Sequence, residues 1–298
     1  MRNIRLVIAY DGTDFQGWQR QPRLPTIQEC LETAVERLTG ETLHVWGSGR
    51  TDAGVHALNQ VANFKTSSPI PCENLVKALN NLLPPTVRVK QAQEVSASFH
   101  ARYDVRAKTY RYRILQAPVC SPFLWRFVWH YPFPLDVDRM EEAARVFLGE
   151  HDFTSFAAAG CEAGEKPRSK GDAGGDVQEE LGIQNSESRI QRLNADKAKS
   201  LQPRGRGGSA DRAGGREMVR NIVVSRLVRC LRASMLIYEV TGNGFLHHMV
   251  RNMVGTLMEV GRGKLAPRDV ERILAARDRT LAGPTAPAQG LCLVKVDY

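Results

Sequence analysis

The chain has 298 residues, of which 42% are hydrophobic, and its formal net charge is +9. This length fits about two ordinary domains, and no stretch approaches the roughly 18 apolar residues of a membrane-crossing helix. The N-terminus leads straight into a strand pattern without the apolar core of a signal peptide, so a cytoplasmic location is expected. The six cysteines are scattered without a CxxC pair, which argues against a disulfide framework and a zinc site.

The positive charge predicts a polyanionic partner. Residues 161–217 contain eleven Lys or Arg and ten Asp or Glu, a net charge of +1, so the other +8 belongs to the rest of the chain. A folded surface can concentrate this charge, and nucleic acid is the natural ligand, bound more weakly as salt rises. The neighbours His247 and His248 should point about 100° apart on a helix, so no metal site is expected there.

The first hundred residues follow the order βαββαβ. A strand at 4–10 ends at Asp11-Gly12, and Thr26 and Glu29 form a capping box that opens a helix ending at Gly40. The other predicted elements are strands at 42–47, 59–66 and 86–94 and a helix at 72–83 that halts at two prolines. This order matches the ferredoxin-like or RRM-like plan.

A second half with a similar pattern follows. Its predicted strands are 105–116, 127–131, 219–228, 234–240 and 291–298, and its helices are 136–148, 245–260 and Pro267–Ala276. We therefore expect an α+β protein with two halves, 1–104 and 105–298, that share a central, mostly antiparallel sheet with helices on one face. The cleft between the halves is the expected ligand site.

Residues 161–217 interrupt the second half. No aromatic residue occurs between Phe156 and Tyr238, and 11 of the 25 glycines fall within 160–215. Such a composition buries too little apolar surface to offset the entropy lost on ordering. We expect a disordered surface insert, with at most a weak helix at 177–193.

A glycine-rich loop carries the residues best suited to chemistry. The segment at 47–57 lies between two predicted strands, and its glycines permit positive φ and close approach of a ligand. Arg50 lies two residues before Asp52 and can keep that carboxylate ionised and oriented. From spacing alone, an Asp in such a loop is more often a turn residue than a catalytic group.

Two further segments supply an aromatic ring and a cation. Tyr110 and Tyr112 share one face of a predicted strand; a flipped base needs a flat aromatic neighbour, although ordinary strand aromatics have the same pattern. In the predicted helix 245–260, Arg251 falls at the edge of a broad apolar arc. An arginine there needs an anion. Asp52, a phosphate or the carboxylate of an ordinary structural salt bridge would serve.

These segments together resemble the TruA family of tRNA pseudouridine synthases, whose signature is similar to residues 49–56. Further motifs recur in family order: Tyr10-Asp11-Gly12, Gly17-Trp18-Gln19-Arg20-Gln21, Phe99-His100-Ala101-Arg102, Tyr110-Arg111-Tyr112, Phe153-Thr154-Ser155-Phe156, 247–252, Asp278-Arg279-Thr280 and 290–294. The resemblance covers the chain except for about 161–217. There the insert replaces a short family turn, so no tRNA contact of that turn is carried over.

The resemblance implies a role for several residues. Asp52 is the nucleophile, Tyr110 stacks on the uracil and takes part in proton transfer, and Arg251 pairs with the catalytic carboxylate. Arg50 corresponds to the residue that displaces the target base. The remaining substrate-binding positions of the loop are Gly49, Thr51 and His56.

The resemblance also implies a fold and a substrate. The fold is the pseudouridine synthase fold, in a homodimer that binds tRNA across both subunits. The substrate is a uridine at positions 38 to 40 of tRNA, on the 3′ side of the anticodon loop and the adjoining stem. The reaction is an isomerisation, and no cofactor or metal is expected, since the chain has neither a P-loop nor a dinucleotide motif.

Two other functions are compatible with parts of the pattern. A non-catalytic RRM-like RNA-binding protein would explain the halves and the basic surface, but it leaves Asp52 and its arginines without a purpose. A metal-dependent nuclease or phosphatase would need several convergent Asp or His ligands, whereas the motif segments supply one Asp.

Overall fold

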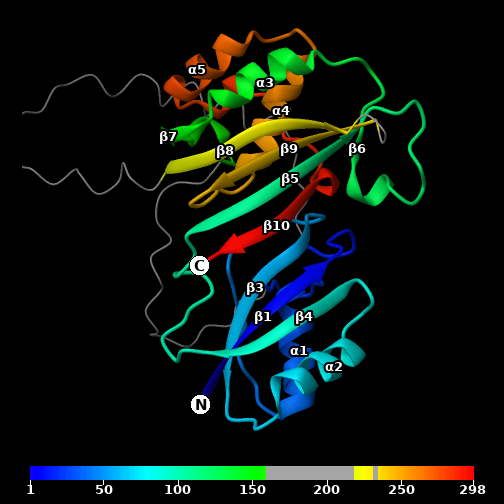
Figure 1. Cartoon of the computed structure of the whole chain (residues 1–298), viewed down its shortest axis with the longest axis vertical. Helices are drawn as coiled ribbons and strands as arrows, with labels where there is room; N and C mark the ends of the chain where they lie inside the picture. Colours follow the sequence, from blue (N-terminus) through cyan, green and yellow to red (C-terminus); the bar gives the residue numbers. More distant parts are fainter. Residues whose placement is uncertain (159–217, 231–233) are drawn as a thin grey trace, which may run out of the picture. The chain divides into compact units, whose positions relative to one another are not determined.

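The computed structural model describes residues 1–158, 218–230 and 234–298 (Figure 1). The expected insert at 161–217 and the weak helix at 177–193 lie outside the described residues. Within these ranges, ten strands form one sheet in the order β4-β1-β3-β10-β5-β9-β8-β7, with β2 beside β3 and β6 beside β5. The strands are β1 (Arg2–Tyr10), β2 (Trp46–Gly47), β3 (His56–Thr66), β4 (Val87–Val95), β5 (Ala107–Leu115), β6 (Trp129–His130), β7 (Gly149–Asp152), β8 (Val219–Cys230), β9 (Met235–Gly242) and β10 (Leu291–Asp297).

The strands of this sheet pair antiparallel except at two places. β10 runs parallel to β3, with Cys292 opposite His56 and Leu293 opposite Ala57, and β6 runs parallel to β5. The last strand of the chain therefore lies beside the residue at which β3 begins, directly after the glycine-rich loop. The mostly antiparallel sheet confirms the predicted α+β class. The division into halves at 104 stays a prediction.

Helices pack against both ends of this sheet. The α-helices of the described ranges are α1 (Ile27–Thr39), α2 (Cys72–Leu82), α3 (Val137–Arg145), α4 (Met249–Gly261) and α5 (Pro267–Ala276). α2 packs on β4 and α1, whereas α3 packs on β8, α4 and α5. Thr26 caps α1 by accepting a hydrogen bond from the Glu29 amide, and Gly40 ends the helix with φ 73°. Both ends of α1 match the prediction.

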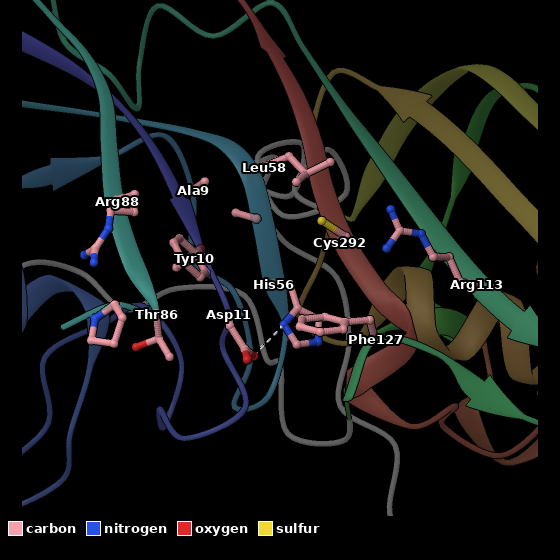
Figure 2. A pocket seen from close by; sticks show the side chains of 12 residues that line it. Ala9, Tyr10, Asp11, His56, Leu58, Thr86, Arg88, Arg113, Phe127 and Cys292 are labelled. Carbon is pink, nitrogen blue, oxygen red and sulfur yellow. Dashed lines mark ion pairs between the residues drawn. The ribbon is translucent and has the colours of Figure 1, made fainter. Parts of the chain in front are cut away.

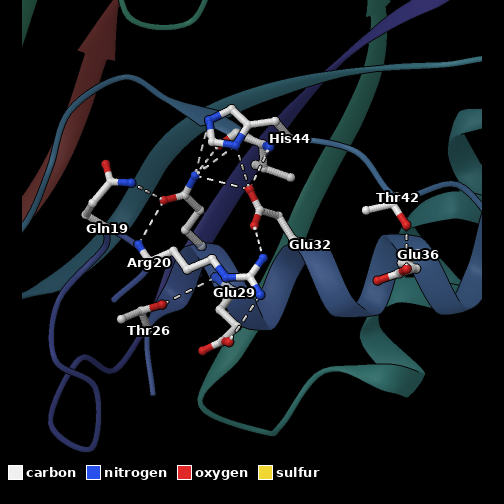
Figure 3. Close-up of polar contacts among 10 residues, drawn as sticks. Gln19, Arg20, Thr26, Glu29, Glu32, Glu36, Thr42 and His44 are labelled. Atoms are coloured by element: carbon white, nitrogen blue, oxygen red, sulfur yellow. Dashed lines mark hydrogen bonds and ion pairs between the residues drawn. The ribbon is translucent and has the colours of Figure 1, made fainter. Parts of the chain in front are cut away.

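The predicted strand at 42–47 is wrong over most of its length, because only Trp46–Gly47 form a strand. Side chains of α1 satisfy this segment instead. The Val45 amide donates to the Glu32 carboxylate at 3.1 Å, and the Thr42 hydroxyl donates to Glu36 at 2.6 Å (Figure 3). A backbone donor that bonds a carboxylate is not available for a strand ladder.

Two other predictions need correction, and one strand was missed. The helix predicted from 245 begins at Met249, because His248 has a left-handed φ of 61°. The strand predicted at 127–131 shrinks to Trp129–His130 after a short 3-10 helix, Trp125–Phe127. Strand β7 was not predicted, since its sequence Gly-Glu-His-Asp has no apolar alternation. No helix in the described ranges has the length and apolar character to cross a membrane.

Candidate active site

The glycine-rich loop between β2 and β3 is anchored by the segment that follows β1. The Trp18 amide donates to the Thr51 carbonyl at 3.0 Å. Gly17 has φ +86°, and a Cβ there would lie 2.4 Å from the same carbonyl oxygen, so only glycine fits. The Thr51 hydroxyl lies 2.9 Å from the buried Tyr10 hydroxyl. Thr51 therefore points inward and fixes the backbone immediately before Asp52.

A second anchor comes from Gln60, which is fully buried in β3. Its amide nitrogen donates to the Gly49 carbonyl at 2.9 Å, and its oxygen accepts from the Ser48 hydroxyl at 2.5 Å. A buried amide satisfied at both ends holds the loop at a defined distance from the sheet. The sequence gives no distinctive signal for Gln60, because β3 contains several other polar residues, among them Asn59 and Asn63.

Asp52 is paired with Arg251, which lies 199 positions later, in α4. Nη1 of Arg251 lies 3.1 Å from Oδ2 of Asp52, and Nε donates to the Ala286 carbonyl at 2.8 Å. The two side chains are 18% and 15% exposed, so water screens the pair only partly. The guanidinium has two fixed partners and therefore sets the orientation of the carboxylate.

Two histidines also face Asp52. Nε2 of His247 lies 3.5 Å from Oδ1 and Nε2 of His248 lies 3.6 Å from Oδ2, and the two rings are 4.0 Å apart. Burial lowers the pKa of His248, although the charge of Asp52 opposes this shift. Burial therefore favours the neutral imidazole of His248.

The expectation that these histidines diverge on a helix is wrong, because both precede the first residue of α4. One ligand atom from each of Asp52, His247 and His248 falls within 4.8 Å of the others, so these residues could together hold a metal ion. The Arg251 guanidinium on the same carboxylate works against a cation there, because like charges repel strongly at such distances.

Tyr110 lines the same site from β5. Its ring is buried and meets Phe245 edge-on with centroids 5.2 Å apart. Burial raises the pKa of Tyr110 far above its ordinary value, and the charges of Tyr10 and Asp52 add to this shift. The phenol is therefore protonated at all physiological pH values. No hydrogen bond within the described ranges engages its hydroxyl, which leaves this group available to a ligand.

Arg50 in the loop and His56 at the start of β3 face other partners. Arg50 donates from Nε to Gln19 at 3.2 Å rather than to Asp52. His56 is buried, and its Nδ1 lies 3.1 Å from the Asp11 carboxylate (Figure 2). It lines a pocket of about 290 Å³ whose lining does not include Asp52. The structure thus brings Asp52, Arg251 and Tyr110 together, whereas His56 belongs to a neighbouring pocket.

Comparison with known proteins agrees with this arrangement. The sequence profile of the tRNA pseudouridine synthase family matches residues 6–104 and 207–298. The chain is 45% identical over 298 residues to the tRNA pseudouridine synthase A of Solibacter usitatus, and 42% identical to that of Brevibacillus brevis, with both chains covered completely. The chain belongs to the tRNA pseudouridine synthase family. Asp52 and Arg251 fall inside the segments that match the family profile, while Tyr110 lies between them, in a stretch that the alignments with these relatives cover.

Proposed function

We propose that this protein converts uridine to pseudouridine in the anticodon stem-loop of tRNA, at positions 38 to 40, with Asp52 as the nucleophile. The observation that carries the proposal is the 3.1 Å pair between Asp52 and Arg251, which joins the loop to α4 beside the buried ring of Tyr110. Relatives that are similar over their whole length are named tRNA pseudouridine synthase A.

The reaction breaks the bond from C1′ to N1 and forms one from C1′ to C5. C5 loses its proton and N1 gains one, so the product is an isomer and no electrons are exchanged with a carrier. A carboxylate suits the first step, because it can attack C1′ or stabilise its positive character while the base is detached. Arg251 keeps Asp52 oriented, and its charge offsets the cost of a partly buried carboxylate.

We assign Arg50 and Tyr110 to displacing and holding the target base. A uridine stacked in a stem-loop must be flipped out at a cost of a few kcal/mol, and Arg50, which is exposed beside Asp52, occupies the space that the base leaves. The ring of Tyr110 lies against the detached uracil and limits the access of bulk water while the base rotates. Since the high pKa keeps its phenol protonated, Tyr110 donates a hydrogen bond to uracil, and water accepts the C5 proton.

One assay separates this function from its rivals. The enzyme is incubated with tRNA that carries tritium at C5 of uridine, in parallel reactions with and without EDTA. Release of tritium without strand cleavage is the expected result. Strand cleavage that EDTA abolishes would favour a nuclease that uses Asp52, His247 and His248 as ligands. Neither event, with tRNA binding retained, would favour an RNA-binding protein.

The homodimer is part of the same proposal. Large apolar side chains gather on the segment between β5 and β6, where Phe123 is 87% exposed and Trp125 is 53% exposed. Exposed apolar side chains gathered on one segment are typical of an interaction site, and we assign this segment to contact with a second copy of the chain. Phe123→Asp should give a monomer in light scattering after gel filtration, whereas Leu281→Asp, at another exposed apolar position, should not.

Two further expectations remain within this proposal. The protein acts in the cytoplasm, where its tRNA substrate is found. Its halves, 1–104 and 105–298, form the two walls of the substrate groove, since Asp52 comes from the first half and Tyr110 and Arg251 come from the second.

A further inference from the structure

Lys108 is a basic residue of β5 that the mechanism above does not use. It lies two residues before Tyr110, so the two side chains leave the same face of the strand. Its neighbour across the ladder in β9 is Gly242, and its neighbour in β10 is Val296. The position that a Cβ would take on Gly242 is filled by the Ile222 side chain and the Asn221 carbonyl, so the Lys108 side chain has no room on that side.

The ammonium group of Lys108 reaches that loop. A Cβ built on Gly49 would lie 2.4 Å from Nζ, so the ammonium lies directly against the backbone of Gly49. Gly49 precedes Arg50 and is itself fixed by Gln60. The cation is therefore held at the edge of the loop that carries Asp52.

The surroundings of Lys108 are positively charged. Burial, together with the charges of Arg102 and Arg220, lowers the pKa of Lys108 to about 8. Within the described ranges, no carboxylate lies within ion-pair distance of Nζ. A partly buried ammonium without a carboxylate partner is stabilised when an anion binds to it, and a phosphate oxygen is the anion that an RNA substrate supplies.

We propose that Lys108, with Arg102 and Arg220 beside it, binds a backbone phosphate that flanks the target uridine. The contact positions the nucleotide between the Asp52 loop and the ring of Tyr110. This inference rests on the proposed function, because it requires an RNA strand in the groove.

The test is a double-mutant cycle, in which Lys108 is replaced by the uncharged Met and a backbone phosphate of the RNA is replaced by an uncharged methylphosphonate. Dissociation constants are measured for the full chain and for Lys108→Met, with an anticodon stem-loop RNA that carries a single methylphosphonate on either side of the target uridine. One of the two methylphosphonates should weaken binding to the wild type by about tenfold, the usual effect of losing a charge-assisted hydrogen bond. The same substitution in the RNA should have no effect on Lys108→Met. Lys264→Met, which removes an exposed charge paired with Glu259, is the matched control and should respond like the wild type.

Equal losses for the wild type and Lys108→Met at both linkages would overturn the inference, because the lysine would then not contact either phosphate. A thermal melt of Lys108→Met checks folding, and the variant should be at least as stable as the wild type since a buried charge is removed. The proposed function is judged separately from tritium release by the wild type. If the wild type releases tritium but the effects of Lys108→Met and of the methylphosphonate on the dissociation constant are additive, only the phosphate contact is refuted.

Discussion

Arg251 holds Asp52 with one guanidinium nitrogen while another nitrogen of the same group is fixed by the Ala286 carbonyl, at 3.1 Å and 2.8 Å respectively. The backbone of the two residues is also joined, because the Ala286 amide donates to the Arg251 carbonyl at 3.1 Å. α4 and the segment before β10 therefore jointly determine where the carboxylate points.

Arg251→Met should lower kcat by about 10² to 10³, the usual effect of removing one fixed charge from an active site. The carboxylate would keep its place in the chain but lose its orientation, so the dissociation constant for tRNA should change by less than about threefold. Single-turnover tritium release and filter binding measure the two quantities. Arg262→Met removes an exposed arginine next to the end of the same helix and should leave both unchanged. A similar loss in both variants would contradict a specific role for Arg251.

Tyr110→Phe should lower kcat by about 10², because the ring remains while the hydrogen bond that the hydroxyl donates to uracil is lost. Its stability should not fall, since the described part of the chain offers the hydroxyl no hydrogen-bond partner. Tyr112 lies on the same face of β5, but its hydroxyl donates to the Pro287 carbonyl at 2.7 Å. Tyr112→Phe should therefore lose about 1 kcal/mol of stability and keep its kcat. Urea unfolding measures the stability of the two variants, and tritium release measures their kcat. A normal kcat in Tyr110→Phe with a reduced kcat in Tyr112→Phe would exclude Tyr110 as the hydrogen-bond donor to uracil.

Gln60→Leu should destabilise the protein by about 1–3 kcal/mol, because the Gly49 carbonyl and the Ser48 hydroxyl lose their buried partner. The loop that carries Asp52 would also move, so kcat should fall even under conditions in which the variant is fully folded. Gln91→Leu changes an exposed glutamine of β4 and is the matched control. An unaltered kcat in folded Gln60→Leu would show that the loop keeps its geometry without this anchor.

The affinity for RNA should depend on pH through Lys108. Its pKa is lowered to about 8 by burial and by Arg102 and Arg220, so the free protein holds this charge below pH 8 and loses it above. A bound phosphate favours the charged form. Affinity should therefore be flat from pH 7 to about 8 and fall between 8 and 9, at constant ionic strength. Fluorescence anisotropy measures this slope, which should be absent in Lys108→Met; an identical slope in both proteins would assign it to other groups.

Local signals in the sequence predicted much of this fold. Thr26 and Gly40 delimit α1, and two consecutive prolines follow the end of α2, because caps and prolines act within one helical turn. The strand prediction failed at 42–45 because the hydrogen bonds of this segment go to Glu32 and Glu36 of α1. Such contacts between a loop and a helix leave no periodic pattern.

The site was predictable only in part. Asp52, Tyr110 and Arg251 come from three separate segments. Their common role was predicted only because the motifs around them resemble those of one family. The left-handed conformation of His248 has no clear signal in the sequence, yet it turns both histidines toward Asp52. Lys108 and Gln60 likewise depend on which strands become neighbours, a long-range property of the sheet.

The most direct measurement is multiple-turnover release of tritium from C5-labelled uridine in tRNA by Asp52→Asn and Asp52→Ala. Both variants should be inactive while binding tRNA nearly as tightly as the wild type, because the carboxylate performs the chemistry and contributes little to binding. Sustained turnover by Asp52→Ala would contradict the account.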